Sequence, residues 1–174
     1  MRLRIYVDGL NLYYRLLKKN KRAKWLDLLA LSRRLFPDDD VVGVRYYTAR
    51  IKPLDDVTAP QRQQVYLRAL GSLNPMVTVH YGYFQIEEKW RRLANPVQGQ
   101  NKSVVVQLPE EKGSDVNLAS HLLSDAFTGR FEKAAVITND ADLAEPIRIV
   151  QHEIGLPVVV VHPTQYPAGV LATA

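Results

Sequence analysis

Four aspartates are the residues of this chain best suited to chemistry, and they lie in three distant segments. They are Asp8, Asp115, Asp140 and Asp142. The first and the last two each follow a short apolar run, whereas Asp115 stands at the start of a helical pattern. Two carboxylates about 5 Å apart repel each other by about 3 kcal/mol at an effective dielectric constant near 20. A cavity that gathers them must therefore bind protons or cations, and the hard cations Mg2+ and Mn2+ suit oxygen ligands best.

Strand and helix patterns alternate along the chain, which predicts an α/β fold with a mainly parallel sheet. Strands are predicted over residues 3–7, 41–49, 76–81, 134–138 and 157–161. Helices are predicted over residues 11–18, from 28 to Pro37, from Pro60 to about 73, from Ser114 to about 127, and over 143–153. Asp27 is expected to cap the second of these helices.

Right-handed crossovers between these strands predict a Rossmann-like three-layer sandwich with the strand order 3-2-1-4-5. The first and fourth strands are then neighbours at the point where the order reverses, and ligands bind beyond their carboxyl ends. Asp8 ends the first strand, and Asp140 follows the fourth. Asp115 begins the helix that crosses to the fourth strand, so it is expected at the same edge. The topology therefore predicts that the carboxylates meet.

Residues 82–111 interrupt the alternation, and we interpret them as a β-hairpin arm inserted into a single domain of residues 1–174. The arm carries a basic patch of Lys89, Arg91 and Arg92. It is a candidate clamp for the substrate. It is equally a candidate dimerisation arm, because the apolar run 104–106 would leave an exposed strand edge that needs cover.

The composition limits the possible functions. The chain has 174 residues and no cysteine, which excludes disulfides, thiolate catalysis and cysteine-bound zinc. Neither a signal-peptide pattern nor an apolar run long enough for a bilayer is present, so a cytoplasmic protein without membrane contact is expected. The net charge of +5 would attract a polyanion to the surface, while bound metal would reverse the sign at the acidic centre.

Each acidic residue also has a purely structural interpretation. Asp115 and Asp142 could cap helices, Asp8 with the following glycine could form a turn, and Asn11 could cap the first helix. The position of all four carboxylates at the ligand-binding edge favours a site.

Three segments, taken in order, resemble the NYN family of PIN-like domains, which includes the LabA-like bacterial proteins. They are Val7-Asp8-Gly9-Leu10-Asn11, Lys112-Gly113-Ser114-Asp115-Val116-Asn117 and Thr138-Asn139-Asp140-Ala141-Asp142-Leu143. The similarity extends over residues 3–161. It implies a PIN-type fold, a Mg2+ or Mn2+ site and cleavage of RNA by an endoribonuclease. By position, it assigns metal binding to the four aspartates and makes Asn11 a polar catalytic residue.

The chain departs from the family pattern in its last motif, where many relatives have Ser-Gly-Asp-Ser-Asp-Phe. Thr138 retains a hydroxyl group and both aspartates remain, but Ala141 lacks a polar side chain. The chain also ends soon after the fifth strand, so a closing C-terminal helix is expected to be missing.

The expected mechanism places one or two cations between the aspartates, where they bind a phosphate oxygen and lower the pKa of an attacking water. Asn11 is expected to donate to the phosphate. Ser114 and Thr138 are expected to orient the metal ligands. Lys112 could bind phosphate or balance charge when metal is absent.

Several basic residues are candidate contacts to the backbone of RNA, most favourably a single strand. They are Arg50 and Arg62, which are expected near the carboxyl end of the second strand, and the basic residues of the arm. The basic run 18–24, beside Tyr13 and Tyr14, could also follow phosphates and stack bases.

Two other functions remain open. The fold could bind nucleic acid or a nucleotide as a non-catalytic regulatory module, although such a binder gains little from concentrated negative charge near phosphate. It could also be a metal-dependent phosphohydrolase of small substrates, which the basic surface disfavours.

Overall fold

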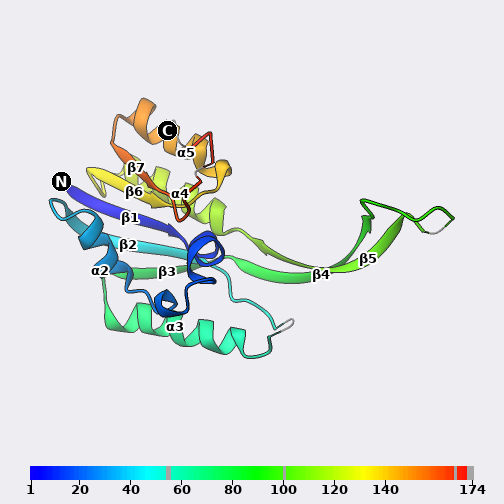
Figure 1. The fold of residues 1–174 in the computed structure, drawn as a ribbon. Helices are drawn as coiled ribbons and strands as arrows, with labels where there is room; N and C mark the ends of the chain where they lie inside the picture. Colours follow the sequence, from blue (N-terminus) through cyan, green and yellow to red (C-terminus); the bar gives the residue numbers. More distant parts are fainter. Residues whose placement is uncertain (54–55, 100, 167, 172–174) are drawn as a thin grey trace.

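A five-stranded parallel sheet forms the centre of the fold (Figure 1). The computed structural model describes residues 1–53, 56–99, 101–166 and 168–171. The strands lie in the order β3-β2-β1-β6-β7, and each pairs in parallel with its neighbour. Their bounds are β1 (Arg2–Asp8), β2 (Asp40–Thr48), β3 (Val77–Tyr81), β6 (Lys133–Ile137) and β7 (Val158–Val161). The predicted order is confirmed, with β6 and β7 as the fourth and fifth strands of the sheet.

Helices cover both faces of this sheet and complete a three-layer sandwich (Figure 1). They are α1 (Gly9–Leu12), which continues as the π-helical turn η1 (Tyr13–Leu17), η2 (Lys21–Ala23), α2 (Leu28–Leu35), α3 (Ala59–Leu73), α4 (Ser114–Phe127), η3 (Ala141–Leu143), α5 (Ala144–Arg148) and η4 (Ile149–Ile154). Within the described residues, no helix combines the length and the apolar character that crossing a membrane requires.

The core is divided by the sheet into two buried clusters. Val7 of β1 packs in a cluster with Leu29 of α2 and Leu67 of α3. Its neighbour Tyr6 belongs to the opposite cluster, together with Leu118 of α4. Successive side chains of a strand point to opposite faces, so the apolar residues of β1 contribute to both clusters.

The ends of β1 and β6 lie side by side because Val7 pairs with Ile137 in the parallel register. Asp8 and Thr138 each follow the paired residue of their strand. The strand order reverses between these two strands, which is where open α/β sheets bind their ligands.

Two helical segments begin earlier than predicted, and an aspartate caps each of them. α1 begins at Gly9 rather than at residue 11, because Asp8 Oδ1 accepts a hydrogen bond from the backbone N–H of Asn11 at 3.0 Å. The helical turns after β6 begin at Ala141 rather than at 143, because Asp140 Oδ1 accepts from the N–H of Asp142 at 3.0 Å. The interpretations of Asn11 and Asp142 as caps are therefore wrong. Asp27 caps α2 as predicted.

The predicted arm is a two-stranded antiparallel hairpin that extends away from the sheet (Figure 1). It consists of β4 (Tyr83–Arg92) and β5 (Ser103–Lys112). Both strands join the domain at the edge where β1 and β6 end, since β4 follows β3 directly and β5 leads through Gly113 into α4. The root of the arm is thus part of the ligand-binding edge.

Candidate functional site

Asp8 is the buried centre of this edge, with a relative exposure of 4%. Its two carboxylate oxygens accept separate hydrogen bonds. Oδ1 accepts from the N–H of Asn11, and Oδ2 accepts from the Thr138 hydroxyl at 3.0 Å. The side chain is therefore held in one orientation. Each oxygen keeps a second lone pair, so the carboxylate can still bind a ligand.

Asp140 is placed beside Asp8 by a short network between α1 and the loop after β6. Its N–H donates to the Thr138 hydroxyl oxygen at 3.0 Å. The N–H of Asn139 donates to Asn11 Oδ1 at 3.1 Å, and Asn139 Oδ1 accepts from the N–H of Ala168 at 2.8 Å. The loop is therefore tied both to the first helix and to the C-terminal segment. Thr138 contacts the metal-ligand candidates as predicted.

Asp115 lies in the first turn of α4, which begins directly after the arm. Glu111 of β5 fixes this start, because its carboxylate accepts from the Ser114 N–H at 2.9 Å and from the Ser114 hydroxyl at 2.7 Å. Ser114 is predicted to orient metal ligands. It lines the same pocket as Glu111 and donates its hydroxyl to that carboxylate, so it joins the arm to the helix, and its role beside a metal ion stays a prediction.

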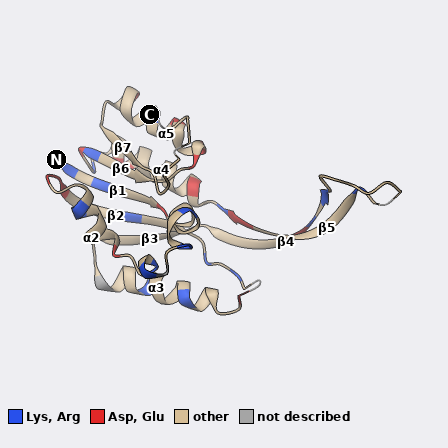
Figure 2. Ribbon diagram, in the orientation of Figure 1, with Lys and Arg blue, Asp and Glu red and all other residues tan. Residues whose placement is uncertain are grey.

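Three of the four predicted aspartates line one pocket of about 220 Å3. The charged residues of its lining are Asp8, Arg15, Glu111, Asp115 and Asp140. We call this space the acidic pocket. Acidic residues gather at the end of β1, at the start of α4 and at the root of the arm (Figure 2). Asp142 does not line the acidic pocket: it is exposed, and it lies within the turn that Asp140 caps.

The electrostatics of the acidic pocket favour uptake of positive charge. Burial raises the pKa of Asp8 to about 6, against the lowering effect of its two hydrogen bonds, with further increases from Asp140 and Glu111. The pKa of Asp115 rises to about 7, first through burial and then through the negative charges of Asp8, Asp140, Glu111 and Asp142. At neutral pH the acidic pocket therefore gains from a bound proton or cation.

The donor set of the acidic pocket suits a hard divalent cation, because all its acidic groups offer oxygen ligands. Within the described part of the chain, however, no group of three or more acidic or histidine side chains is spaced to hold one ion together. Mg2+ commonly binds through one or two carboxylates and keeps several waters. Two aspartates of the acidic pocket with water fit that pattern, and a cage of four aspartates does not.

None of the predicted basic residues lines the acidic pocket, and several are paired with acids. Lys112 Nζ lies 3.3 Å from Glu110 Oε2, and Lys89 Nζ lies 2.9 Å from both Glu87 and Glu110. The arm thus neutralises part of its own charge. Arg91 and Arg92 are exposed near the far end of β4.

The two arginines predicted near the end of β2 also lie outside the acidic pocket. Arg50 stacks over the Tyr81 ring at 4.8 Å. Arg62 pairs with Asp56 and lines a second cavity beside the acidic pocket.

Two charged lining residues, Arg15 and Glu111, were not predicted from the sequence, and Tyr14 was predicted only as a stacking residue beside the basic run. Arg15 follows Asn11 by four residues, a spacing that places side chains on one face of a helix. This signal was available in the sequence. Glu111 had no comparable signal, because its position depends on where the arm joins the domain.

Comparison with known proteins gives one named similarity and one shared fold. No family model matches the chain. Over an alignment of 190 residues, the chain is 28% identical to 6-hydroxy-3-succinoylpyridine 3-monooxygenase HspA of Pseudomonas putida (strain DSM 28022 / S16). This match includes 94% of the chain, which spans 60% of the length of that relative. The similarity is thus to an enzyme.

The shared fold is that of a crystal structure of a protein of unknown function from Vibrio parahaemolyticus RIMD 2210633. It matches with a TM-score of 0.56 at 16% identity, and the match covers 99% of this chain and 87% of that one. It supports the architecture described above.

Proposed function

We propose that this protein is a divalent-cation-dependent ribonuclease of the NYN type, which hydrolyses phosphodiester bonds in RNA. The observation that carries the proposal is the meeting of Asp8, Asp115 and Asp140 in the acidic pocket, at the point where the strand order reverses. These are the residues to which the family resemblance assigns metal binding.

The residues of the acidic pocket would have different roles in such a reaction. Asp8 and Asp140 would hold the cation, since both follow the rigid ends of core strands, and Asp115 would complete the acidic wall. A bound divalent cation supplies charge neutralisation and a water of lowered pKa. Thr138 and the backbone of Asn11 keep the Asp8 carboxylate in place.

Two lining residues suit the phosphate. Asn11 Oδ1 already accepts from Asn139, so its amide NH2 is the group that can donate to a phosphate oxygen. Arg15 brings a guanidinium group to the same pocket. The net charge of +5 favours approach of a polyanion over the rest of the surface.

A non-catalytic nucleic-acid module is less well supported. Uncompensated carboxylates repel phosphate, so a binder would place its acids elsewhere. The same geometry would serve a phosphohydrolase of small substrates, and only a substrate panel separates that function from cleavage of RNA.

The test offers the purified protein labelled single-stranded RNA, single-stranded DNA and free nucleotides, each with Mn2+ or Mg2+ and with a chelator. We expect cation-dependent cleavage of RNA that Asp8→Asn and Asp140→Asn abolish. Asp38→Asn is the matched control, because Asp38 is exposed in the turn before β2, at the opposite edge of the sheet. Binding without cleavage would support the module, and phosphate release from nucleotides alone would support the phosphohydrolase.

A second candidate function is conversion of a small aromatic nitrogen heterocycle. The named relative is a monooxygenase of a substituted pyridine, and the cavity beside the acidic pocket is walled by aromatic rings. Incubation with 6-hydroxy-3-succinoylpyridine, oxygen and a reductant, followed by mass analysis of the product, tests this candidate. Unchanged substrate would exclude it under those conditions.

A further inference from the structure

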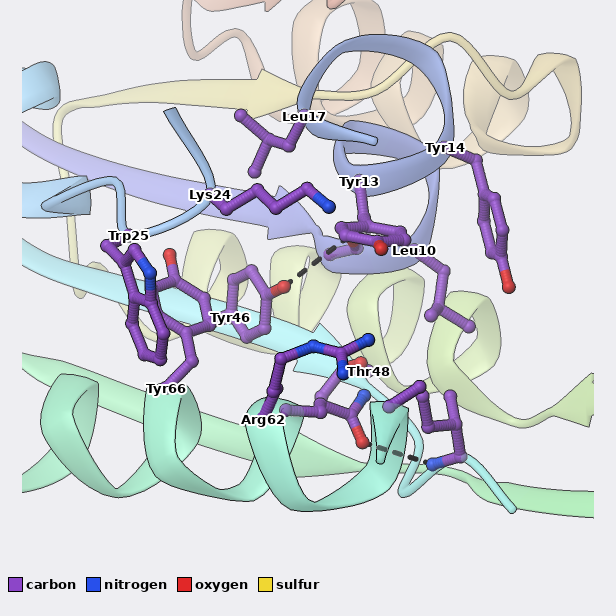
Figure 3. Close-up of a pocket in the computed structure, with 14 residues that line it drawn as sticks. Leu10, Tyr13, Tyr14, Leu17, Lys24, Trp25, Tyr46, Thr48, Arg62 and Tyr66 are labelled. Carbon is purple, nitrogen blue, oxygen red and sulfur yellow. Dashed lines mark hydrogen bonds between the residues drawn. The ribbon is translucent and has the colours of Figure 1, made fainter. Parts of the chain in front are cut away.

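A second cavity has a volume of about 130 Å3, and its lining residues are drawn in Figure 3. Five aromatic side chains from four segments of the chain line it: Tyr13, Tyr14, Trp25, Tyr46 and Tyr66. We call it the ring cavity. Leu10 and Tyr14 line both the ring cavity and the acidic pocket, so the two spaces are neighbours.

The aromatic wall of the ring cavity is held in a fixed arrangement. Tyr66 meets Tyr46 and Trp25 edge to face, with ring centroids 6.3 Å and 6.2 Å apart. The Tyr66 hydroxyl donates to the carbonyl of Leu26 at 2.8 Å. Tyr46 is buried, and any side chain at Gly9 would collide with its ring. Because these contacts hold the side chains in place, the cavity is already shaped to bind a planar aromatic ring.

One side of the wall is accessible from solvent. Trp25 has a relative exposure of 58% and Tyr14 one of 52%. Tryptophan and tyrosine rings exposed to this degree beside a cavity offer faces on which an entering aromatic ring can stack.

Two cations line the same cavity, and their nitrogen ends extend toward the side where Tyr13 and Leu10 lie (Figure 3). Arg62 is already paired with Asp56. Lys24 has no ion-pair partner among the described residues. Lys24 is therefore the group available to an anion.

The volume of the ring cavity limits the size of the aromatic ligand that it can hold. An apolar cavity of about 150 Å3 is known to hold one benzene molecule. A space of about 130 Å3 with a solvent-accessible side therefore accommodates one six-membered ring. A fused two-ring system would extend beyond it into solvent.

We propose that the ring cavity binds a single-ring aromatic heterocycle that carries an attached anionic group. The ring packs against Tyr46, Tyr66 and Trp25, and the anion meets Lys24. In a pyrimidine nucleotide of RNA, the ring would be the base and its own phosphate would meet Lys24, while the next phosphate along the strand would lie in the acidic pocket. That identification rests on the proposed nuclease function, whereas binding of the ring does not.

Trp25 provides the reporter for a test. The chain has two tryptophans, Trp25 and Trp90, so Trp90→Phe leaves the emission of Trp25 alone. In this background, with a chelator present, Trp25 fluorescence is followed while uridine 5′-monophosphate, orotate, adenosine 5′-monophosphate or ribose 5-phosphate is added. We expect a saturable change in Trp25 fluorescence with uridine monophosphate or orotate. Adenosine monophosphate should bind much more weakly, and ribose 5-phosphate should not bind.

The source of the ligand follows from the same titrations. Binding of uridine monophosphate but not orotate identifies a nucleotide, and the reverse identifies a free heterocyclic acid. Lys24→Met should weaken binding about fivefold, the loss of about one charged contact. Lys19→Met is the matched control, because Lys19 is exposed in the same basic run and does not line the cavity.

The inference is overturned if neither ring ligand gives a saturable change. It is also overturned if ribose 5-phosphate acts as strongly as uridine monophosphate, or if the two lysine variants behave alike. Asp140→Asn should leave binding of orotate intact. If ring binding is present while RNA is not cleaved, the nuclease proposal fails and this one stands.

Discussion

The hydroxyl of Thr138 donates to Asp8 Oδ2 at 3.0 Å, and this bond joins the carboxyl ends of the neighbouring strands β1 and β6. The same hydroxyl oxygen accepts from the N–H of Asp140. One buried side chain therefore sets the positions of two carboxylates of the acidic pocket.

Thr138→Val should weaken both the fold and the activity. Valine has the same shape but removes the hydroxyl, which leaves Asp8 with one donor fewer and the Asp140 N–H without its acceptor. We expect a loss of about 1–3 kcal/mol in the free energy of unfolding, measured by denaturant titration. RNA cleavage should fall at least tenfold. Thr138→Ser keeps the hydroxyl and should remain close to the parent; equal rates for all three proteins would contradict this role.

Asp115→Asn should stabilise the metal-free protein at alkaline pH. The unfolded carboxyl ionises near pH 3.8 and the folded one near 7, so between these values the folded state holds a proton that the unfolded state has released. The free energy of unfolding therefore falls as pH rises through this window. The asparagine variant has no carboxyl group at this position, so its free energy of unfolding does not fall for this reason.

The stability gain of Asp115→Asn should be near zero below pH 4 and greatest above pH 7. We expect about 1 kcal/mol, because solvent screens a partly exposed group, or a rise of about 2–4 °C in Tm for a chain of this size. Thermal unfolding at pH 5 and pH 8 checks the difference. If the variant and the parent had the same Tm at pH 8, the prediction would be contradicted, because the ionised Asp115 carboxylate would not destabilise the folded state.

Gly82→Ala should displace the root of the arm. A Cβ at this position would collide with the Glu111 carboxylate, and it would lie 2.5 Å from the Lys112 carbonyl oxygen and 2.9 Å from the Ser114 nitrogen. We expect about 1–3 kcal/mol of destabilisation, as for other overpacked sites, and reduced cleavage because α4 begins there. Gly71→Ala in α3 meets open space and should be neutral or stabilising. Similar losses in both variants would contradict the packing argument.

The arm should mediate a homodimer. An isolated two-stranded hairpin is marginally stable in water, and Trp90 and Val105, which face each other across the strands, are 68% and 47% exposed. Sedimentation velocity should find a dimer that the double variant Trp90→Glu/Val105→Glu converts to a monomer. A monomeric parent protein would leave the arm as a candidate substrate clamp.

Much of the acidic pocket could be predicted from local patterns and topology. The apolar runs before Asp8 and Asp140 indicate two buried strands, and right-handed crossovers make these strands neighbours. Asp115 follows from its place at the start of a crossover helix. The place of Asp142 just after the fourth strand predicts that it joins them, but Asp142 lies in the helical turn that Asp140 caps, and its side chain is exposed.

The rest required the tertiary structure. Glu111 reaches the acidic pocket because the hairpin register and the close approach at Gly82 fix the arm against α4. The ring cavity gathers Trp25, Tyr46 and Tyr66 from a loop, a strand and a helix. None of these aromatic residues differs in sequence from an ordinary core residue, so their meeting had no local signal.

Titration of the purified protein with Mn2+, followed by the loss of the free-ion electron paramagnetic resonance signal, measures whether the acidic pocket binds a divalent cation. We expect saturable binding that Asp8→Asn and Asp140→Asn each abolish or weaken at least tenfold, while Asp38→Asn binds like the parent. Failure of the parent to bind Mn2+ at millimolar concentration, or equal binding by all four proteins, would show that the carboxylates of the acidic pocket do not form a cation site.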